Sequence, residues 1–172
     1  MNRILLKFIN VILFLSVFTT YWGSTAFGVD LFIPAVEVKT GQTIDIPIML
    51  DQVDNLAGVK LVMKYDPNIL IFKKATKTEH TSSLMHIAND KKPGLLIVVM
   101  AGPRGIKGKD FSILSLTFDT KKDLKSNHTT NIKITEVQLM SDQLKELTCN
   151  IKTDPIKILP EKTTETDVKE TQ

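Results

Sequence analysis

Three stretches of the sequence contain residue types that bind metals or phosphate, but none has the spacing that such binding needs. His80 and His86 lie six positions apart with no nearby Cys and no tight group of Asp or Glu, which matches no metal motif. Gly102–Lys109 is glycine-rich and basic, but a strand pattern follows it where a phosphate loop needs a helix. Asp51–Asn55 lacks the glycine and closing glutamate of an EF-hand loop. We expect no metal, phosphate or other cofactor bound to this chain.

Catalytic constellations are missing as well. No serine lies in a nucleophile-elbow motif, and no spacing singles out a pair of carboxylates for acid–base work. The single cysteine, Cys149, alternates with polar neighbours as a small buried hydrophobe does, although an intermolecular disulfide is the alternative. The sequence therefore predicts a protein that is not an enzyme.

Side chains in the stretch from Gly58 to Leu70 alternate with the two-residue period of a strand. We expect this strand to position the binding residues. Asp66-Pro67-Asn68 then predicts a turn, since Pro67 fixes its own φ and disfavours a helix at Asp66. Two opposite faces follow from this period. The predicted inward set is Val59, Leu61, Met63 and Tyr65, and the outward set is Gly58, Lys60, Val62 and Lys64.

The other segments also read as short strands, and no helix of any length is credible. Strands are expected over 31–38, interrupted by Pro34, and over 44–50, 69–72, 95–101, 111–120, 131–135 and 144–159, with a shorter one over 84–88. We interpret Asp51–Asn55 as a polar connection and Gly102–Lys109 as a hairpin loop. The predicted fold class is all-β: an antiparallel β-sandwich with jelly-roll topology and about nine strands.

The two ends of the chain differ from its middle. Residues 1–28 have a positive start, an apolar stretch and small residues at cleavage spacing, the order of an export signal; the alternative is an uncleaved membrane anchor. Residues 29–159 form the predicted sandwich, and 160–172 is a polar tail expected to be disordered. Of 22 basic residues, Arg3 and Lys7 lie in the first segment, which leaves 20 against 19 acidic ones. The export signal predicts a secreted or extracytoplasmic protein, at the cell surface or in the periplasm. The charge balance argues against nucleic-acid binding.

The order of these signals resembles a cohesin domain of bacterial cellulosome scaffolds. Two motifs carry most of the resemblance: Thr40-Gly41-Gln42-Thr43 leading into the strand 44–48, and the alternating strand that ends Tyr65-Asp66-Pro67-Asn68-Ile69-Leu70. The segments 95–101, 111–118 and 132–137 continue the similarity, which covers nearly all of 29–159.

The resemblance implies a non-catalytic module that captures a dockerin, a small helical protein module held in shape by calcium. Calcium is thus expected in the partner and not in this chain. The implied partner-binding residues are Gly58, Lys60, Val62, Lys64, Ile97, Val99, Ala101, Leu144 and Glu146. Gly58 and Lys60 stand where the best-known cohesins have Asn and Asp, so the sequence predicts poor binding of a standard dockerin.

Two other functions fit the same architecture. A carbohydrate-binding module is the first alternative, although sugar platforms use exposed aromatic rings, and after residue 28 the chain has no Trp and one Tyr. An envelope assembly protein that adds a strand to an exposed sheet edge is the second. The sequence names neither the partner nor the oligomeric state.

Overall fold

A computed structural model describes residues 28–161 of the 172-residue chain. The predicted signal segment, apart from Gly28, and most of the predicted polar tail lie outside these residues. The described part consists of eleven strands: β1 (Val29–Ile33), β2 (Val36–Lys39), β3 (Thr43–Lys64), β4 (Leu70–Lys77), β5 (Met85–Asn89), β6 (Leu95–Thr120), β7 (His128–Thr130), β8 (Lys133–Ser141), β9 (Glu146–Leu147), β10 (Cys149–Thr153) and β11 (Ile156–Leu159).

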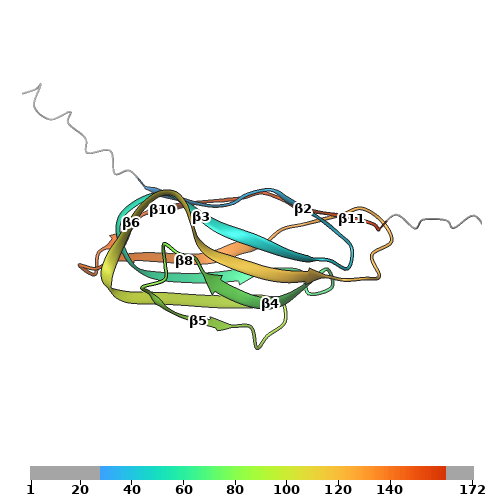
Figure 1. Ribbon diagram of the computed structural model, residues 1–172, viewed down its shortest axis with the longest axis horizontal. Helices are drawn as coiled ribbons and strands as arrows, with labels where there is room; N and C mark the ends of the chain where they lie inside the picture. The colour runs from blue at the N-terminus through green and yellow to red at the C-terminus, as the bar shows by residue number, and fades with distance from the viewer. Residues whose placement is uncertain (1–27, 162–172) are drawn as a thin grey trace, which may run out of the picture.

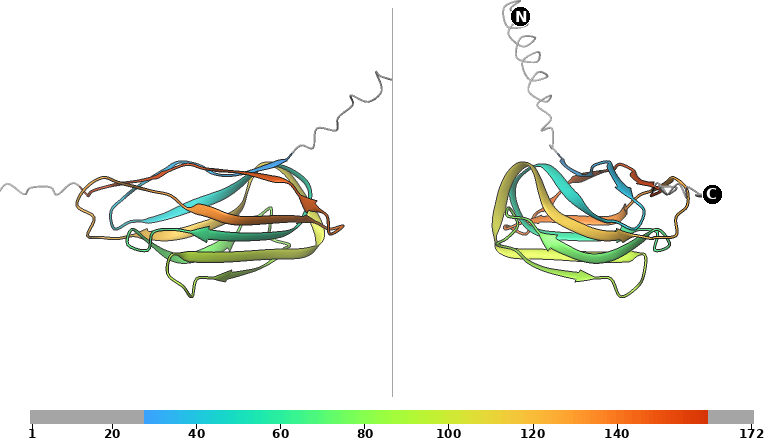
Figure 2. Two further views of the ribbon diagram at one scale, coloured as in Figure 1. Left: turned by 180° about the vertical axis from the view of Figure 1, so that it is seen from behind. Right: turned by 45° about the vertical axis from the view of Figure 1, so that its right-hand side comes forward.

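Two long strands, β3 and β6, pair with each other along most of their length and belong to both layers of the sandwich (Figure 1). The first half of β3 and the second half of β6 lie between β1 and β4, and β10 extends this layer beyond β1. The second half of β3 and the first half of β6 lie between β8 and β5, with β9 beyond β8. Strands β2, β11 and β7 form a separate small sheet. Figure 2 shows the layers from two further directions.

The core lies between the layers and follows the predicted alternation. Val59, Leu61 and Met63 are buried, and so are Leu96, Val98 and Met100 on the neighbouring stretch of β6. Phe118 is fully buried, with the rings of Tyr65 and Phe72 packed edge-on at centroid distances of 5.1 and 5.5 Å. Each fully buried large apolar side chain contributes about 1.5–3 kcal/mol relative to an exposed one. Of the predicted inward set, Val59, Leu61 and Met63 are thus core, and Tyr65, just after β3, is half-buried against it.

The two predicted breaks in these long strands are wrong. Asp51–Asn55 is part of β3, and Gly102–Lys109 is part of β6 and not a hairpin loop. The strands bend together here, with register shifts at Val53, Leu56 and Gly58. Such irregularities bend a strand without ending its pairing. A Cβ at position 105 would lie 1.5 Å from Oδ1 of Asn55, so glycine lets the two backbones approach at the bend.

Other turns occur where the sequence predicts them. After β3, the Asp66 carbonyl accepts the N–H groups of Ile69 and Leu70, and Asp66 Oδ1 accepts the Asn68 N–H at 2.8 Å. This is the local bonding that favours Asp in turns. Gly94 has a φ of 81° before β6, a conformation that glycine adopts without steric strain.

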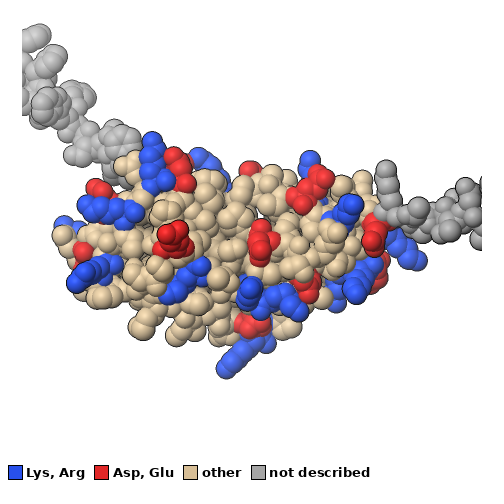
Figure 3. Space-filling view, viewed as in Figure 1, with Lys and Arg blue, Asp and Glu red and all other residues tan. Residues whose placement is uncertain are grey.

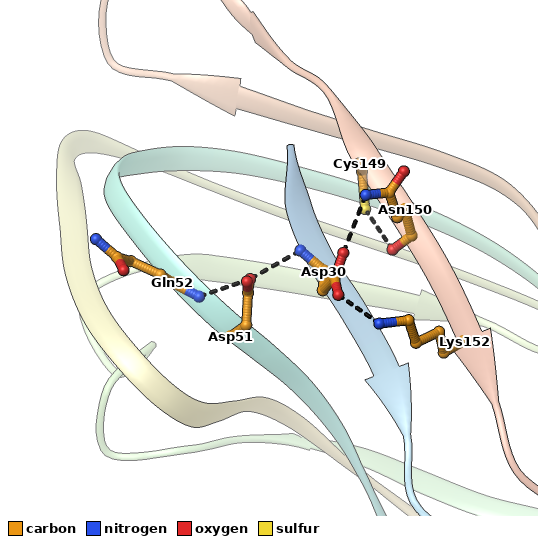
Figure 4. A network of polar contacts seen from close by, with 6 residues as sticks. All are labelled: Asp30, Asp51, Gln52, Cys149, Asn150 and Lys152. Carbon is orange, nitrogen blue, oxygen red and sulfur yellow. Dashed lines mark hydrogen bonds and ion pairs between the residues drawn. The ribbon is translucent and has the colours of Figure 1, made fainter. Parts of the chain in front are cut away.

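Two strand pairs are parallel, which the alternation of single strands cannot reveal: β1 with β10, and β2 with β11. A polar network supports the first pair (Figure 4). Asp30 of β1 accepts hydrogen bonds from Lys152 Nζ at 2.6 Å and Asn150 Nδ2 at 3.0 Å, while Asp51 of β3 accepts the Asp30 N–H at 2.7 Å. The hydrogen bond from Lys152 is the main cause that lowers the pKa of Asp30, and the same bond raises the pKa of Lys152.

The predicted fold class is confirmed: the described chain is a β-sandwich of the jelly-roll kind. Residues 28–161 hold no helix with the length and apolar composition that crossing a membrane requires.

Candidate functional site

One side of a sheet carries most of the predicted binding residues, and we call it the candidate face. It is the outward side of β9, β8, the second half of β3, the first half of β6, and β5. Strand register aligns its side chains in three rows across the strands, because residues opposite one another in an antiparallel pair point to the same side. The rows are Glu146–Met140–Gly58–Ala101–Met85, then Gln138–Lys60–Val99–Ile87, then Glu136–Val62–Ile97–Asn89.

The part of the candidate face over β6 and β5 is apolar. Met85 is 78% exposed, Ile87 73% and Val99 42%. Ile87 lies directly opposite Val99 and Met85 opposite Ala101, so these side chains form one continuous patch. Large apolar side chains gathered on one exposed sheet surface mark an interaction site more often than scattered single ones do.

The part over β3 and β8 is polar, and its central lysine is paired. Lys60 Nζ lies 2.5 Å from Oε1 of Glu136 on β8. Lys60 alone would place a positive charge at the centre of the face, but the carboxylate of Glu136 neutralises it there. Elsewhere, Lys and Arg are interspersed with Asp and Glu over the side shown in Figure 3.

The ends of the candidate face carry different charges. Lys64, the last outward residue of β3, lies opposite Lys133 of β8, and both are exposed. Glu146 lies at the other end, opposite Met140. Leu144, predicted to belong to a strand, is instead in the turn between β8 and β9, with a φ of 60° and an exposure of 83%. Leu144 therefore lies at the tip beside the face and not in its rows.

The structure thus brings eight of the nine predicted residues onto one surface, and adds others that sequence reasoning missed. Met85 and Ile87 lie in a strand that was predicted, and their two-residue spacing was the available signal. Glu136, Gln138 and Met140 alternate in the same way on β8. Their place on this side depends on which strands pair, which the sequence does not show.

No constellation for metal binding occurs in the described part of the chain: residues 28–161 contain no group of three or more His, Cys, Asp or Glu side chains that could hold a metal ion. His86 is in β5 with its ring toward β4, where Nε2 lies 3.1 Å from the carbonyl oxygen of Ala75. His80 packs its ring against Phe111 at a centroid distance of 4.9 Å. The chemistry that this surface offers is apolar contact with charged residues around it.

Comparison with solved structures finds the same fold in several cohesins. One is the cohesin of the Coh-OlpC–Doc435 complex from Clostridium thermocellum, with a TM-score of 0.70 and 18% identity over 82% of this chain and 100% of that one. Another is the sixth cohesin of Acetivibrio cellulolyticus scaffoldin B, solved with a Cel5 dockerin mutant, with a TM-score of 0.67 and 16% identity over 78% and 99%. A non-cellulosomal cohesin from Archaeoglobus fulgidus has a TM-score of 0.64 and 15% identity over 80% and 94%.

A search of curated proteins finds no match. The profile of the Cohesin domain family matches residues 29–158, which is most of the chain and nearly all of its described part. The resemblance that the strand order and the Tyr-Asp-Pro-Asn turn indicate is thereby confirmed. The chain belongs to the cohesin domain family.

Proposed function

We propose that the chain is a non-catalytic binding module that captures a dockerin-type protein on the candidate face. Family membership supports the class of partner, because several solved structures with this fold are cohesins in complex with a dockerin. The observation that carries the proposal is the apolar patch of Met85, Ile87 and Val99 on an otherwise charged surface.

The composition of the candidate face suits a protein partner. Protein interfaces have an apolar centre within a polar rim, and their central residues lose water on binding. Here the apolar patch is bordered by the Lys60–Glu136 pair on one side and by Lys64 and Glu146 at the ends of the strands. An isolated charge under a bound partner would lose its hydration without compensation, whereas Lys60 keeps Glu136 as its own counter-ion.

Calcium belongs to the partner in this proposal. A dockerin needs calcium for its shape, so EDTA should prevent capture by unfolding the partner and should leave this chain folded. The chain itself supplies the apolar surface.

Polysaccharide binding is the weaker alternative. Sugars stack on exposed aromatic rings, but Tyr65, the only Tyr or Trp among residues 28–161, is half-buried against Phe118. Export of the module to the cell surface or beyond remains part of the proposal, and its support is the composition of residues 1–28.

The test uses the tagged full chain as bait in an extract of its source cell, with calcium and with EDTA. We expect a dockerin-bearing protein to be retained only with calcium. Val99→Asp should abolish its capture, and Ile71→Asp should not. Ile71 is the matched control, because it is equally exposed at 42% but lies on β4, outside the candidate face. Equal capture by both variants, or retention of proteins without a dockerin, would refute the proposal.

A further inference from the structure

A hollow of about 550 Å³ opens at the end of the candidate face, where β3 ends and β8 begins. We call it the terminal hollow. Its walls come from the turn after β3, from β7 and the start of β8, and from the turn between β10 and β11. The lining residues are Lys64, Tyr65, Asp66, Ile69, Thr129, Thr130, Asn131, Lys133, Thr153 and Pro155.

Two lysines on the rim of the terminal hollow face each other. Lys64 and Lys133 are register partners of the antiparallel pair β3–β8, and like charges in that arrangement repel. The four ion pairs formed within residues 28–161 include neither lysine. This local repulsion would be relieved by a bound negative group.

The one acidic side chain of the lining does not cancel these charges. Asp66 Oδ1 already accepts the Asn68 N–H of the turn at 2.8 Å. Two lysines against one carboxylate leave the terminal hollow positive. Thr129, Thr130 and Asn131 add hydroxyl and amide groups, which donate hydrogen bonds to carboxylate oxygens.

The terminal hollow adjoins the candidate face, because Lys64 is both the last outward residue of β3 and a lining residue. The other end of the face has a carboxylate, Glu146, with Asp142 and Lys145 beside it in the turn. The bend of β6 adds Arg104, Lys107 and Lys109 to that end, with Asp54 paired to Lys107, so charges of both signs are mixed there. The two ends therefore differ, because at the terminal hollow two lysines lie opposite each other without an ion pair.

We propose that the terminal hollow receives an acidic side chain of the partner bound on the candidate face, and thereby fixes the direction in which that partner lies. This inference rests on the proposed function. The partner is identified by its chemistry: an apolar surface for Met85, Ile87 and Val99, with Asp or Glu at the end that reaches Lys64 and Lys133. Electrostatic complementarity of this kind sets orientation and register more than raw affinity.

The first arm of the test uses the full chain and a defined probe, the peptide acetyl-Asp-Glu-Asp-Glu-amide, with acetyl-Asn-Gln-Asn-Gln-amide as its neutral counterpart. Backbone amide shifts are followed by NMR at low and at high ionic strength. We expect the acidic peptide alone to shift the amides of Thr129–Lys133, and high salt to remove the effect. Equal shifts with the neutral peptide, or shifts spread over the lysines of the whole surface, would overturn the inference.

The second arm measures the Kd of the dockerin-bearing protein retained in the pull-down. The double variant Lys64→Gln/Lys133→Gln should weaken binding about tenfold at low salt, and Asp66→Asn should strengthen it about two- to fivefold while keeping its turn acceptor. The control Lys107→Gln/Lys109→Gln removes the same charge at the distant bend and should leave Kd unchanged.

The two proposals fail in distinguishable ways. If the Lys64/Lys133 variant binds like its control while Val99→Asp abolishes capture, the terminal hollow is not a subsite and the proposed function stands. If the acidic peptide binds in the terminal hollow but no dockerin is captured, the proposed function is wrong. The terminal hollow then remains a binding site for an acidic group of another protein.

Discussion

Lys60 Nζ donates a hydrogen bond to Glu136 Oε1 at 2.5 Å, although the strand register places neither residue directly opposite the other. Lys60 faces Gln138 and Glu136 faces Val62, so the ion pair is diagonal across β3 and β8. The two side chains are 41% and 52% exposed, and water screens their attraction. We infer that this pair affects what the face recognises more than how stable the fold is.

A double-mutant cycle of Lys60→Ala and Glu136→Ala checks this. Exposed ion pairs contribute about 0.2–1 kcal/mol, so we expect a coupling energy in that range from urea unfolding. The charge-reversed pair Lys60→Glu/Glu136→Lys should unfold at nearly the same urea concentration as the unchanged protein. A coupling energy of several kcal/mol would contradict the exposed geometry.

The next residue along β3 should behave in the opposite way. Leu61 is fully buried, so Leu61→Ala removes apolar atoms from the core and leaves a cavity, at a cost of about 2–5 kcal/mol in the free energy of unfolding. Lys60→Ala should cost less than about 1 kcal/mol. Urea unfolding of both variants measures the difference. Similar losses would show that the alternation along β3 does not divide core from surface.

That alternation is the part of the structure that sequence predicts best. A two-residue period assigns Leu61 inward and Lys60 outward without knowledge of any neighbouring strand, because the geometry of a single strand dictates it. The turn at Asp66-Pro67 is equally local, since proline and the Asp side chain determine it by themselves. Both features require information from only a few adjacent residues.

Features that depend on distant residues were missed or wrong. Gly102–Lys109 has the composition of a loop, but it stays in β6 because β3 bends alongside it and Gly105 lets Asn55 approach. The Glu136 partner of Lys60 lies 76 positions away, and the parallel pairing of β1 with β10 joins segments about as far apart as the described chain allows. Pairing of this kind is set by packing of the whole sandwich, which a single sequence does not encode in any short pattern.

Asp30 and Lys152 should give the chain an acid-sensitive contact. The hydrogen bond from Lys152 lowers the pKa of Asp30 below its ordinary value of 3.8. A depressed folded-state pKa stabilises the fold above the unfolded-state value, and this contribution is lost as the pH falls through the folded-state pKa. Lys152→Met should raise the Asp30 titration midpoint, measured by NMR of the carboxyl carbon. Lys107→Met is the control, because Lys107 pairs with a different carboxylate, Asp54, at 3.9 Å. An unchanged Asp30 midpoint in Lys152→Met would refute the role of Lys152 in lowering the pKa of Asp30.

Cys149 should react slowly with thiol reagents. Burial raises the pKa of its thiol, with the nearby carboxylates of Asp30 and Asp51 acting in the same direction. The thiolate is the reactive form, so the native protein should have less of it than the urea-unfolded chain at the same mildly alkaline pH. Iodoacetamide labelling followed by mass spectrometry compares the two. Faster labelling of the native chain would show that the thiol is not half-buried, and would favour the alternative of an intermolecular disulfide.

Strand β5 should contribute as much to partner capture as the central strands do. Ile87 is 73% exposed and lies opposite Val99, so an aspartate at position 87 would place a charge inside the apolar patch. Leu144 is even more exposed but lies at the tip of the β8–β9 turn, outside the three rows. We therefore expect Ile87→Asp to weaken dockerin binding about a hundredfold or more, and Leu144→Asp to weaken it less, as calorimetry would measure. Both side chains are solvent-exposed, so neither variant should shift the unfolding midpoint. The reverse order of affinities would move the centre of the interface from β5 and β6 to the β8–β9 turn.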